Sequence, residues 1–172
     1  FLNAQPVTGA LLGVVVLGFE TVKSLGLSVS VLERFAGPGD NTLFDRQKFW
    51  EHSIACGVAA RLLAARLRYP VRGRGEAFAG GILHDIGKLI LSQYFPEEFA
   101  KILELMRRDN LYIGKAEEQV LGVTHAEVGS WLAEKWNLPR QLVDTIAFHH
   151  APGRLPRTPG LPSLIHLADF LC

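Results

Sequence analysis

Residues Ala77 to Leu91 read AFAGGILHDIGKLIL. In and around this stretch apolar side chains recur every three or four positions, which is the period of a helix buried on one side. They are Phe78, Ile82, Leu83, Ile86, Leu89 and Ile90. The pattern predicts one continuous helix from Glu76 to about Tyr94. That helix would carry the adjacent pair His84 and Asp85 near its centre, among apolar neighbours.

The helical period continues along the rest of the chain, and strand-like alternation is absent. Clusters of glycine and proline separate the periodic segments. Further helices are expected from about Leu17 to the turn at Gly37, from Asp45 to about Arg68, from Pro96 onward, from Thr124 to Asn137, from Pro139 to His150, and from Ser163 to Cys172. Together these segments predict a single all-α domain over residues 1–172, a bundle of about seven helices joined by short loops.

Composition and charge exclude several classes of protein. A chain of 172 residues with 48% apolar and 20% charged residues has the ordinary composition of one globular domain. Its formal charge of +1 provides no overall field that would attract nucleic acid or an anionic membrane, so we expect neither partner. The longest apolar run, Val7 to Phe19, is shorter than the roughly twenty residues that a membrane span needs. The lack of an export signal and the presence of only two cysteines favour a cytoplasmic protein.

A sharp helix start is predicted at Thr124. The string Thr124-His125-Ala126-Glu127 has the spacing of a capping box, in which the threonine hydroxyl and the glutamate carboxylate satisfy free backbone amides reciprocally. This start places His125 in the first turn of its helix.

Histidine and aspartate recur along the chain, each inside or at the end of an expected helix. In order they are His52, His84, Asp85, His125, His149, His150 and Asp169. Burying so many imidazoles and carboxylates among apolar side chains is costly unless they share a partner, and a divalent ion would satisfy them together. Imidazole and carboxylate suit iron, manganese, nickel, cobalt or zinc, whereas two cysteines are too few for a thiolate-rich site.

Each of these residues also has a purely structural explanation. A single histidine such as His52 is often an ordinary core or surface residue. Adjacent residues on a helix diverge by roughly 100°. His149 and His150 would therefore serve different ligands, or one would face solvent, unless the helix unwinds there. Two interpretations of His166 stay open, a residue behind the ligands or only a polar neighbour. Cys56 is most simply a small buried residue.

The order H, HD, H, HH, D resembles the HD superfamily of metal-dependent phosphohydrolases, and the surrounding sequence is similar to one branch, the HDOD (HD-related output) domain. The matching strings are FWEHS from Phe49 to Ser53, AFAGGILHDIGKLIL from Ala77 to Leu91, THAEVGSWLAEKWNLP from Thr124 to Pro139, and FHH from Phe148 to His150. The resemblance covers nearly the whole chain. HDOD domains usually carry more helical sequence upstream, so residues 1–13 are interpreted as the remnant of a truncated or unobserved N-terminal helical part.

The resemblance implies a set of ligands for one or two divalent transition-metal ions. By analogy with two-metal HD proteins, one ion would be held by His52, His84, Asp85 and Asp169. Asp85 would bridge to a second ion, held by His125, His149 and His150.

The resemblance also implies roles at the site for two basic residues. Lys88 lies one turn beyond His84, so its ammonium can share that face and neutralise a phosphoryl oxygen. In an active enzyme Asp85 and Lys88 would be catalytic. Lys88 and Arg154 are the residues expected to contact phosphate.

Two functions from different classes follow. The first is a metal-binding HDOD-type output domain in signal transduction, which binds a nucleotide-like or phosphate ligand and acts on a signalling partner or an attached domain. The alternative is an active metal-dependent phosphohydrolase for phosphomonoesters, nucleotides or cyclic dinucleotides.

Related enzymes that open cyclic di-GMP follow their paired histidines with a glutamate and a tyrosine-proline motif. Here Ala151-Pro152-Gly153 follows instead, which disfavours that particular substrate. A third interpretation is a metal-free scaffold with relic histidines, and the complete set of positions disfavours it.

Overall fold

The computed structural model describes residues 44–155 and 160–172. Within them the elements are α3 Arg46–Arg66, α4 Val71–Leu83, α5 Ile86–Tyr94, α6 Pro96–Asp109, α7 Ile113–Leu121, α8 His125–Lys135, α9 Arg140–Phe148, the short 3₁₀ helix η1 Pro152–Arg154, and α10 Gly160–Leu171. No strand occurs in these two ranges, so the predicted all-α class is confirmed. The helix expected from Leu17 and the interpretation of residues 1–13 lie outside the described residues.

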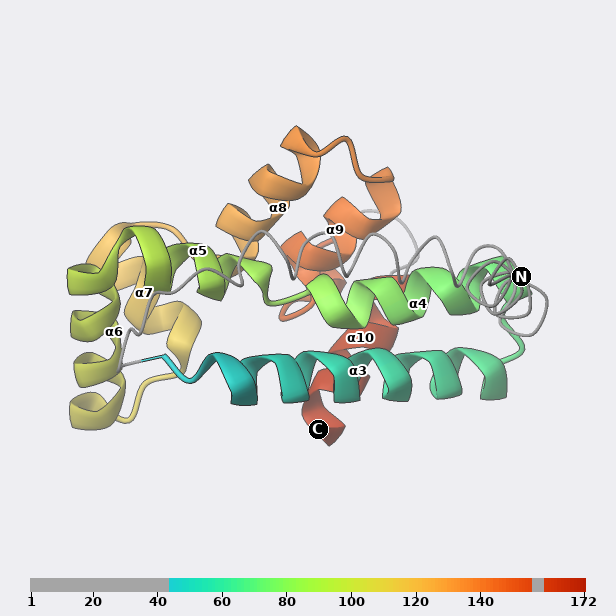
Figure 1. Ribbon diagram of the computed structural model, residues 1–172, viewed down its shortest axis with the longest axis horizontal. Coiled ribbons are helices and arrows are strands. Elements are labelled where there is room, and N and C mark those ends of the chain that lie inside the picture. Colours follow the sequence, from blue (N-terminus) through green and yellow to red (C-terminus); the bar gives the residue numbers. More distant parts are fainter. Residues whose placement is uncertain (1–43, 156–159) are drawn as a thin grey trace, which may run out of the picture.

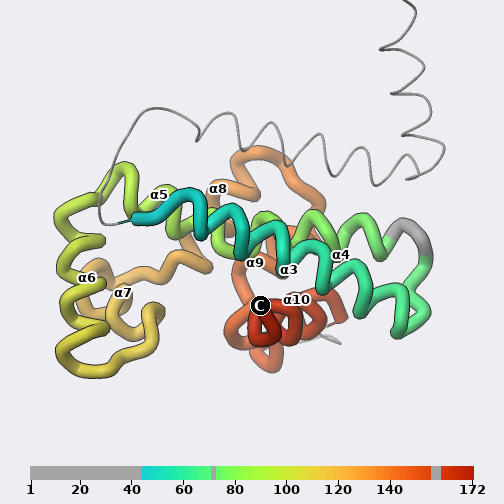
Figure 2. The backbone as a smooth tube through the Cα atoms, turned by 60° about the horizontal axis from the view of Figure 1, so that its bottom comes forward, coloured from blue at the N-terminus to red at the C-terminus, as the bar shows by residue number. Residues whose placement is uncertain are grey.

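The long helices α3 and α4 form an antiparallel pair that runs along the molecule (Figure 1). The helix α10 crosses this pair and packs against α3, α4 and α9, while α8 packs on α5 and α9. Helices α6 and α7 pack together at one end of the molecule, away from α10 (Figure 2). None of the described helices is both long and apolar enough to cross a membrane.

Local signals account for several helix ends. The carboxylate of Asp45 accepts a hydrogen bond of 3.0 Å from the backbone amide of Lys48, and this N-cap starts α3 one residue later. The same helix ends at Arg66, two residues before the predicted end at Arg68. It cannot include Arg68, because this residue has a left-handed backbone conformation with φ of 61°. The capping box of Thr124 and Glu127 is present as predicted and starts α8 at His125.

The prediction of one helix from Glu76 to Tyr94 is wrong. Two helices, α4 and α5, occupy this stretch, and the chain bends between them at His84 and Asp85. The backbone of Asp85 lies at φ −100° and ψ 10°, outside the helical region. Apolar periodicity does not reveal this bend, because the apolar residues keep the same three- and four-residue spacing on both sides of it.

Other helix boundaries also differ from the expectations. The helix α7 was not predicted; Asn110 ends α6 with φ of 51°, and Gly122 ends α7 with φ of 73°. The last helix, α10, begins at Gly160 rather than at Ser163.

Two apolar clusters hold the helices together. One joins α3, α4, α5, α8 and α9 through Phe49, Phe78, Ile82, Leu83, Ile86, Leu89, Ala133, Val143 and Ile146. The other joins α3, α4, α9 and α10 through Ala60, Ala64, Ala77, Ala79, Leu142, Leu161, Leu164, Ile165 and Ala168. The helices that share these clusters are also the ones that carry the histidine and aspartate positions predicted from the sequence.

Glycines allow two of the closest helix contacts. A Cβ atom on Gly81 of α4 would lie 2.6 Å from the backbone of Gly57 on α3. On α5, a Cβ atom on Gly87 would collide with the carbonyl group of His125, at the start of α8. Both glycines therefore set the spacing of backbones that carry residues of the site.

Candidate metal centre

The seven predicted ligands lie together, although they come from five parts of the chain. These are α3, the junction of α4 and α5, the start of α8, the turn after α9, and α10. The possible ligand atoms form two groups, and within each group they all lie within 4.8 Å of one another. We define the first set as His52, Cys56, His84 and Asp169. We define the second set as Asp85, His125, His149 and His150.

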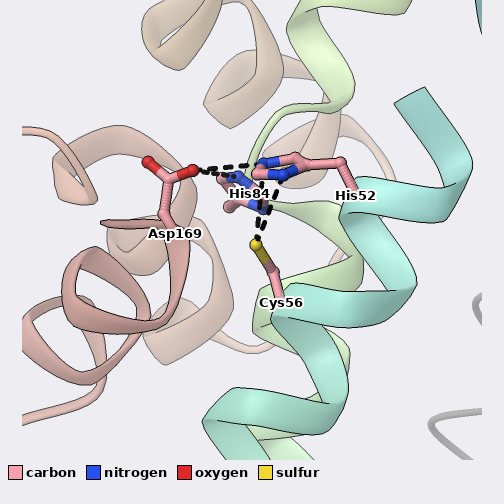
Figure 3. A group of neighbouring side chains, drawn as sticks. All are labelled: His52, Cys56, His84 and Asp169. Atoms are coloured by element: carbon pink, nitrogen blue, oxygen red, sulfur yellow. Dashed lines mark hydrogen bonds and ion pairs between the residues drawn. The ribbon is translucent and has the colours of Figure 1, made fainter. Parts of the chain in front are cut away.

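The first set connects α3 and the α4–α5 junction to α10 (Figure 3). Nε2 of His52 lies 3.1 Å from Oδ1 of Asp169, and Nε2 of His84 lies 3.5 Å from the same oxygen. His84 is fully buried, whereas the side chains of His52 and Asp169 are 31% and 21% exposed. An ion from solvent can therefore reach this set from the side of His52 and Asp169.

The second set is more deeply buried. Oδ1 of Asp85 lies 3.2 Å from Nε2 of His125 and 3.5 Å from Nε2 of His149. Nε2 of His125 is 3.0 Å from Nε2 of His150. Three imidazole nitrogens and one carboxylate oxygen thus converge in a space where only His150 is partly exposed.

Asp85 faces both sets. While its Oδ1 points to the second set, its Oδ2 lies 3.4 Å from Nε2 of His84, in the first set. Oδ2 also accepts a short hydrogen bond from the ammonium group of Lys88. The carboxylate is 1% exposed, so both of its oxygens act within the protein. This is the position that a ligand bridging two ions would need.

Hydrogen bonds on the outer side of two imidazole rings orient them toward the sets. Nδ1 of His84 donates to the carbonyl of Gly81 at 2.7 Å, and Nδ1 of His149 donates to that of Ile146 at 2.8 Å. In the neutral ring the lone pair is then on Nε2, which faces the set. The buried Nε2 atoms of His84 and His149, and Oδ1 of Asp85, make no hydrogen bond with any residue in the described ranges.

Glu117 is a residue of the site that the sequence analysis missed. This fully buried carboxylate on α7 accepts hydrogen bonds from the backbone amide and from Nδ1 of His125, at 2.9 and 2.7 Å. It fixes the tautomer of His125 and directs Nε2 into the second set, as carboxylates behind metal-bound histidines do. A signal was present, because Glu117 falls on the helical stripe of Ile113, Ala116 and Val120, where an acid is out of place.

The turn after α9 resolves the alternatives for the paired histidines. The helix ends at Phe148, and the following two residues lie in a turn, so the divergence expected on a continuous helix does not apply. The rings of His149 and His150 have centroids 3.9 Å apart and both face the second set. Nδ1 of His166 donates to the carbonyl of His149 at 2.7 Å, which places His166 behind a predicted ligand.

The two residues expected to contact phosphate lie in different places. The ammonium group of Lys88 is within the centre, on Asp85, and is 20% exposed. Arg154 is exposed and lies apart from the two sets, at the rim of a cavity of about 190 Å³. Since His125 and His150 also line this cavity, it opens onto the second set.

The buried charges of the centre shift its pKa values strongly. Burial alone would raise the pKa of Asp85, but the charges of His84 and Lys88 hold it well below the usual value. Burial would lower the pKa of His84, yet the charge of Asp85 and the contact with Asp169 raise it to about 10. In the metal-free protein a proton on Nε2 of His84 therefore occupies the position that an ion would take.

Burial also dominates at the paired histidines. It lowers the pKa of His149 to about 4. The pKa of His150 falls to about 2, through burial and the nearby charges of His149 and His125. Both imidazoles are thus neutral near pH 7 and can act as ligands without losing a proton.

The metal-free chain is expected to lose stability as the pH falls from about 6.5 to about 4.5. In this range His149 and His150 gain protons in the unfolded chain but stay neutral in the folded one, so protons favour unfolding. The raised pKa values of His84 and His125 oppose this loss only near pH 6.5, where the unfolded imidazoles are half protonated. We expect the free energy of unfolding to drop on the order of 2 kcal/mol, measured by guanidinium unfolding of chelator-treated protein. Equal or greater stability at the lower pH would contradict these pKa values.

The donor atoms of the centre suit a divalent transition-metal ion. Imidazole nitrogens and carboxylate oxygens are ligands of borderline metals such as iron, manganese and zinc. Buried polar atoms normally form hydrogen bonds, and here three of them, among the described residues, meet other site residues only in charge contacts of 3.2–3.5 Å. A bound ion would provide a partner for the Nε2 atoms and for Asp85 at once.

Comparison with known proteins identifies a protein family and several solved structures that this chain matches. The family model of the HDOD domain matches residues 1–152. An HDOD domain protein of unknown function from Geobacter sulfurreducens superposes with a TM-score of 0.80 at 28% identity, over 92% of this chain and 52% of that protein. A protein named as a candidate phosphohydrolase, from Shewanella amazonensis SB2B, gives a TM-score of 0.80 at 29% identity, over 92% of this chain and 56% of that protein.

A third solved structure connects the fold to signalling. A candidate signal transduction protein from Marinobacter aquaeolei VT8 has a TM-score of 0.72 at 25% identity, over 88% of this chain and 34% of that protein. The chain thus spans between about a third and just over half of these three proteins.

Proposed function

Because the chain belongs to the HDOD domain family, we propose that it is a metal-binding output domain of a signal-transduction protein. It would hold one or two divalent transition-metal ions. The structural change that accompanies binding or loss of an ion would be passed to an attached domain or a signalling partner. Likeness to a protein named for signal transduction supports this role, as does the share of that protein, 34%, that the chain covers.

The observation that carries the proposal is the convergence of buried imidazole nitrogens on the carboxylate oxygens of Asp85 and Asp169, at 3.2–3.5 Å. Nε2 of His84, Nε2 of His149 and Oδ1 of Asp85 lack hydrogen bonds with any residue of ranges 44–155 and 160–172. A sequence that keeps all of them, and orients both rings through Nδ1, is best explained by a ligand that binds at the Nε2 atoms and replaces the proton on His84.

The residues proposed to hold the ions follow the two sets. One ion would be bound by His52, His84 and Asp169. The other would be bound by Asp85, His125, His149 and His150. A bound ion would add positive charge to that of Lys88 and would attract an anionic ligand.

Such an ion would link helices that otherwise share side-chain packing and the contacts of His52 and His84 with Asp169. The first set joins α10 to α3 and to the α4–α5 junction, and the second joins that junction to α8 and to the turn after α9. Loading or loss of an ion would therefore change how firmly α10 is held to the bundle. An attached domain or partner that contacts α10 could sense this difference.

The cavity beside the second set is the proposed place for a phosphate or nucleotide-like ligand. Its rim carries Lys115 and Arg154, and its inner wall includes His150. An anion there would lie between exposed cations and the side of the second set that is open to solvent.

Elemental analysis of protein purified without chelators tests metal binding directly. We expect between one and two equivalents of iron, manganese, nickel, cobalt or zinc per chain. Treatment with a chelator should lower the melting temperature and re-addition of the metal should restore it, since a ligand that binds only the folded chain stabilises it. The absence of any transition metal, with no thermal shift on adding one, would contradict the proposal.

The alternative function, a metal-dependent phosphohydrolase, is favoured by one observation. The ammonium of Lys88 lies on Asp85, between the two sets, where it could neutralise a phosphoryl oxygen. Manganese- or iron-loaded protein should then cleave phosphomonoesters, nucleotides or cyclic dinucleotides in a substrate panel. Lys88→Met, with its metal content retained, should lose that activity. If the loaded wild type cleaves none of these compounds, the enzyme is excluded and the output domain stands.

Glu117→Gln is expected to weaken metal binding about 10- to 100-fold, because it removes the charged acceptor that orients and polarises His125. The change preserves shape, and calorimetric titration with zinc or manganese provides the measurement. Glu118→Gln is the matched control, because Glu118 is the neighbouring, exposed glutamate on α7 and pairs with Lys115. Equal affinities for the two variants would show that Glu117 has no influence on the second set.

A further inference from the structure

Cys56 points into the first set from the same helix as His52. The two residues lie one turn apart on α3, so their side chains share one face (Figure 3). The thiol is fully buried, and its Sγ lies 3.5 Å from Nε2 of His52. Burial, reinforced by the charges of Cys172 and Asp169, raises the pKa of this thiol, so it is protonated in the metal-free protein.

Three of the six distances between the four donor atoms are close to the edges of a tetrahedral site. With metal bonds of about 2.0–2.1 Å to nitrogen or oxygen and about 2.3 Å to sulfur, tetrahedral donors lie roughly 3.3–3.6 Å apart. The observed edges are 3.1 Å from His52 to Asp169, 3.5 Å from His84 to Asp169, and 3.5 Å from Cys56 to His52. All four donor atoms fall within 4.8 Å of one another.

Asp85 is less available to the first set than Cys56. Its Oδ2 is engaged by the ammonium of Lys88, and its Oδ1 faces His125 and His149. The sulfur of Cys56 has no charged partner of this kind; it contacts the ring nitrogens of His52 and the thiol of Cys172. The fourth position of the first set is therefore open to sulfur.

We propose that Cys56 binds a metal ion as a thiolate, together with His52, His84 and Asp169. This proposal rests on the proposed metal site and adds to it a sulfur ligand that changes the choice of metal. A thiolate with two imidazoles and one carboxylate favours zinc or cobalt and disfavours manganese. The first set would then hold a softer ion than the second set, whose donors are only nitrogen and oxygen.

Cobalt(II) is the probe for this assignment, because a cobalt–thiolate bond produces a charge-transfer band in the near ultraviolet that histidine and aspartate do not. The sequence has two cysteines, and Cys172 lies close enough to Cys56 to influence its thiol. The titration is therefore made on Cys172→Ser protein, in which Cys56 is the remaining thiol. We expect the band to grow with added cobalt and to saturate, together with the visible bands of bound cobalt.

The double variant Cys56→Ser/Cys172→Ser should lose the near-ultraviolet band while visible cobalt bands persist, from ions held by the imidazoles. If Cys172→Ser binds cobalt with visible bands but no charge-transfer band, Cys56 is not a ligand and the proposed metal site survives. If it binds no cobalt at all, both proposals fail. Far-ultraviolet circular dichroism establishes that each variant is folded.

X-ray absorption of zinc-loaded Cys172→Ser protein is a second test of whether Cys56 is a ligand, and it leaves Cys56 unchanged. A sulfur neighbour at about 2.3 Å, beside nitrogen or oxygen neighbours at about 2.0–2.1 Å, supports the thiolate. A zinc environment with only nitrogen and oxygen neighbours overturns it.

Discussion

Gly87→Ala is expected to destabilise the chain by about 3 kcal/mol or more and to abolish metal binding at the second set. The added Cβ atom would collide with the carbonyl oxygen of His125 and lie 2.7 Å from its carbonyl carbon and 2.9 Å from the amide nitrogen of Gly129. These are backbone atoms, which cannot rotate away. Either α5 and α8 separate, which displaces His125, or the fold is lost.

Thermal unfolding measures this effect, as a fall in melting temperature of roughly 10 °C. Gly153→Ala is the matched control, because an alanine Cβ at that exposed position would meet no atom within 4 Å. We expect it to be neutral. A Gly87→Ala protein with wild-type stability and metal content would show that α5 and α8 can move apart without disturbing the centre.

Asp85→Ala is expected to lower metal content roughly tenfold or more, the largest loss for any single ligand, since this carboxylate faces both sets. The stabilisation of the folded chain by added metal should disappear with it. Elemental analysis and thermal unfolding, each with and without added metal, measure the two effects.

Asp85→Asn keeps the volume of the buried side chain, and it provides a second test if the alanine variant does not fold. Asp109→Ala is the control, because Asp109 is an exposed carboxylate at the end of α6 whose partner is the neighbouring Arg108. Wild-type metal content in both variants of Asp85 would show that this carboxylate is not a metal ligand.

Much of this fold is predictable from local pattern. Apolar periodicity identified most of the helices, and the capping box placed His125 at the first residue of α8. The break at His84 and Asp85 was not predictable in this way. It depends on tertiary contacts that hold Asp85 between the two sets, and a helix period contains no information about them.

The candidate site was predictable in its residue types but less so in its surroundings. The histidines and aspartates stand out because their chemistry is unusual in apolar helices. Glu117 and Cys56 did not stand out, since a glutamate on a helix and a small buried cysteine both have ordinary explanations. Their importance depends on distances across the fold, of 2.7 Å to Nδ1 of His125 and 3.5 Å to Nε2 of His52.

The contact between His52 and Asp169 joins residues 117 positions apart in the sequence. During synthesis on the ribosome, the first set cannot be completed until α10 has emerged and closed this long loop. The second set lies wholly between Asp85 and His150, so a nascent chain can assemble it earlier. Where ions are scarce, the two sets would therefore bind ions in a fixed order, the second set first. The packing of α10 onto α3 would then complete the first set and make the newly made domain able to bind its full complement of metal.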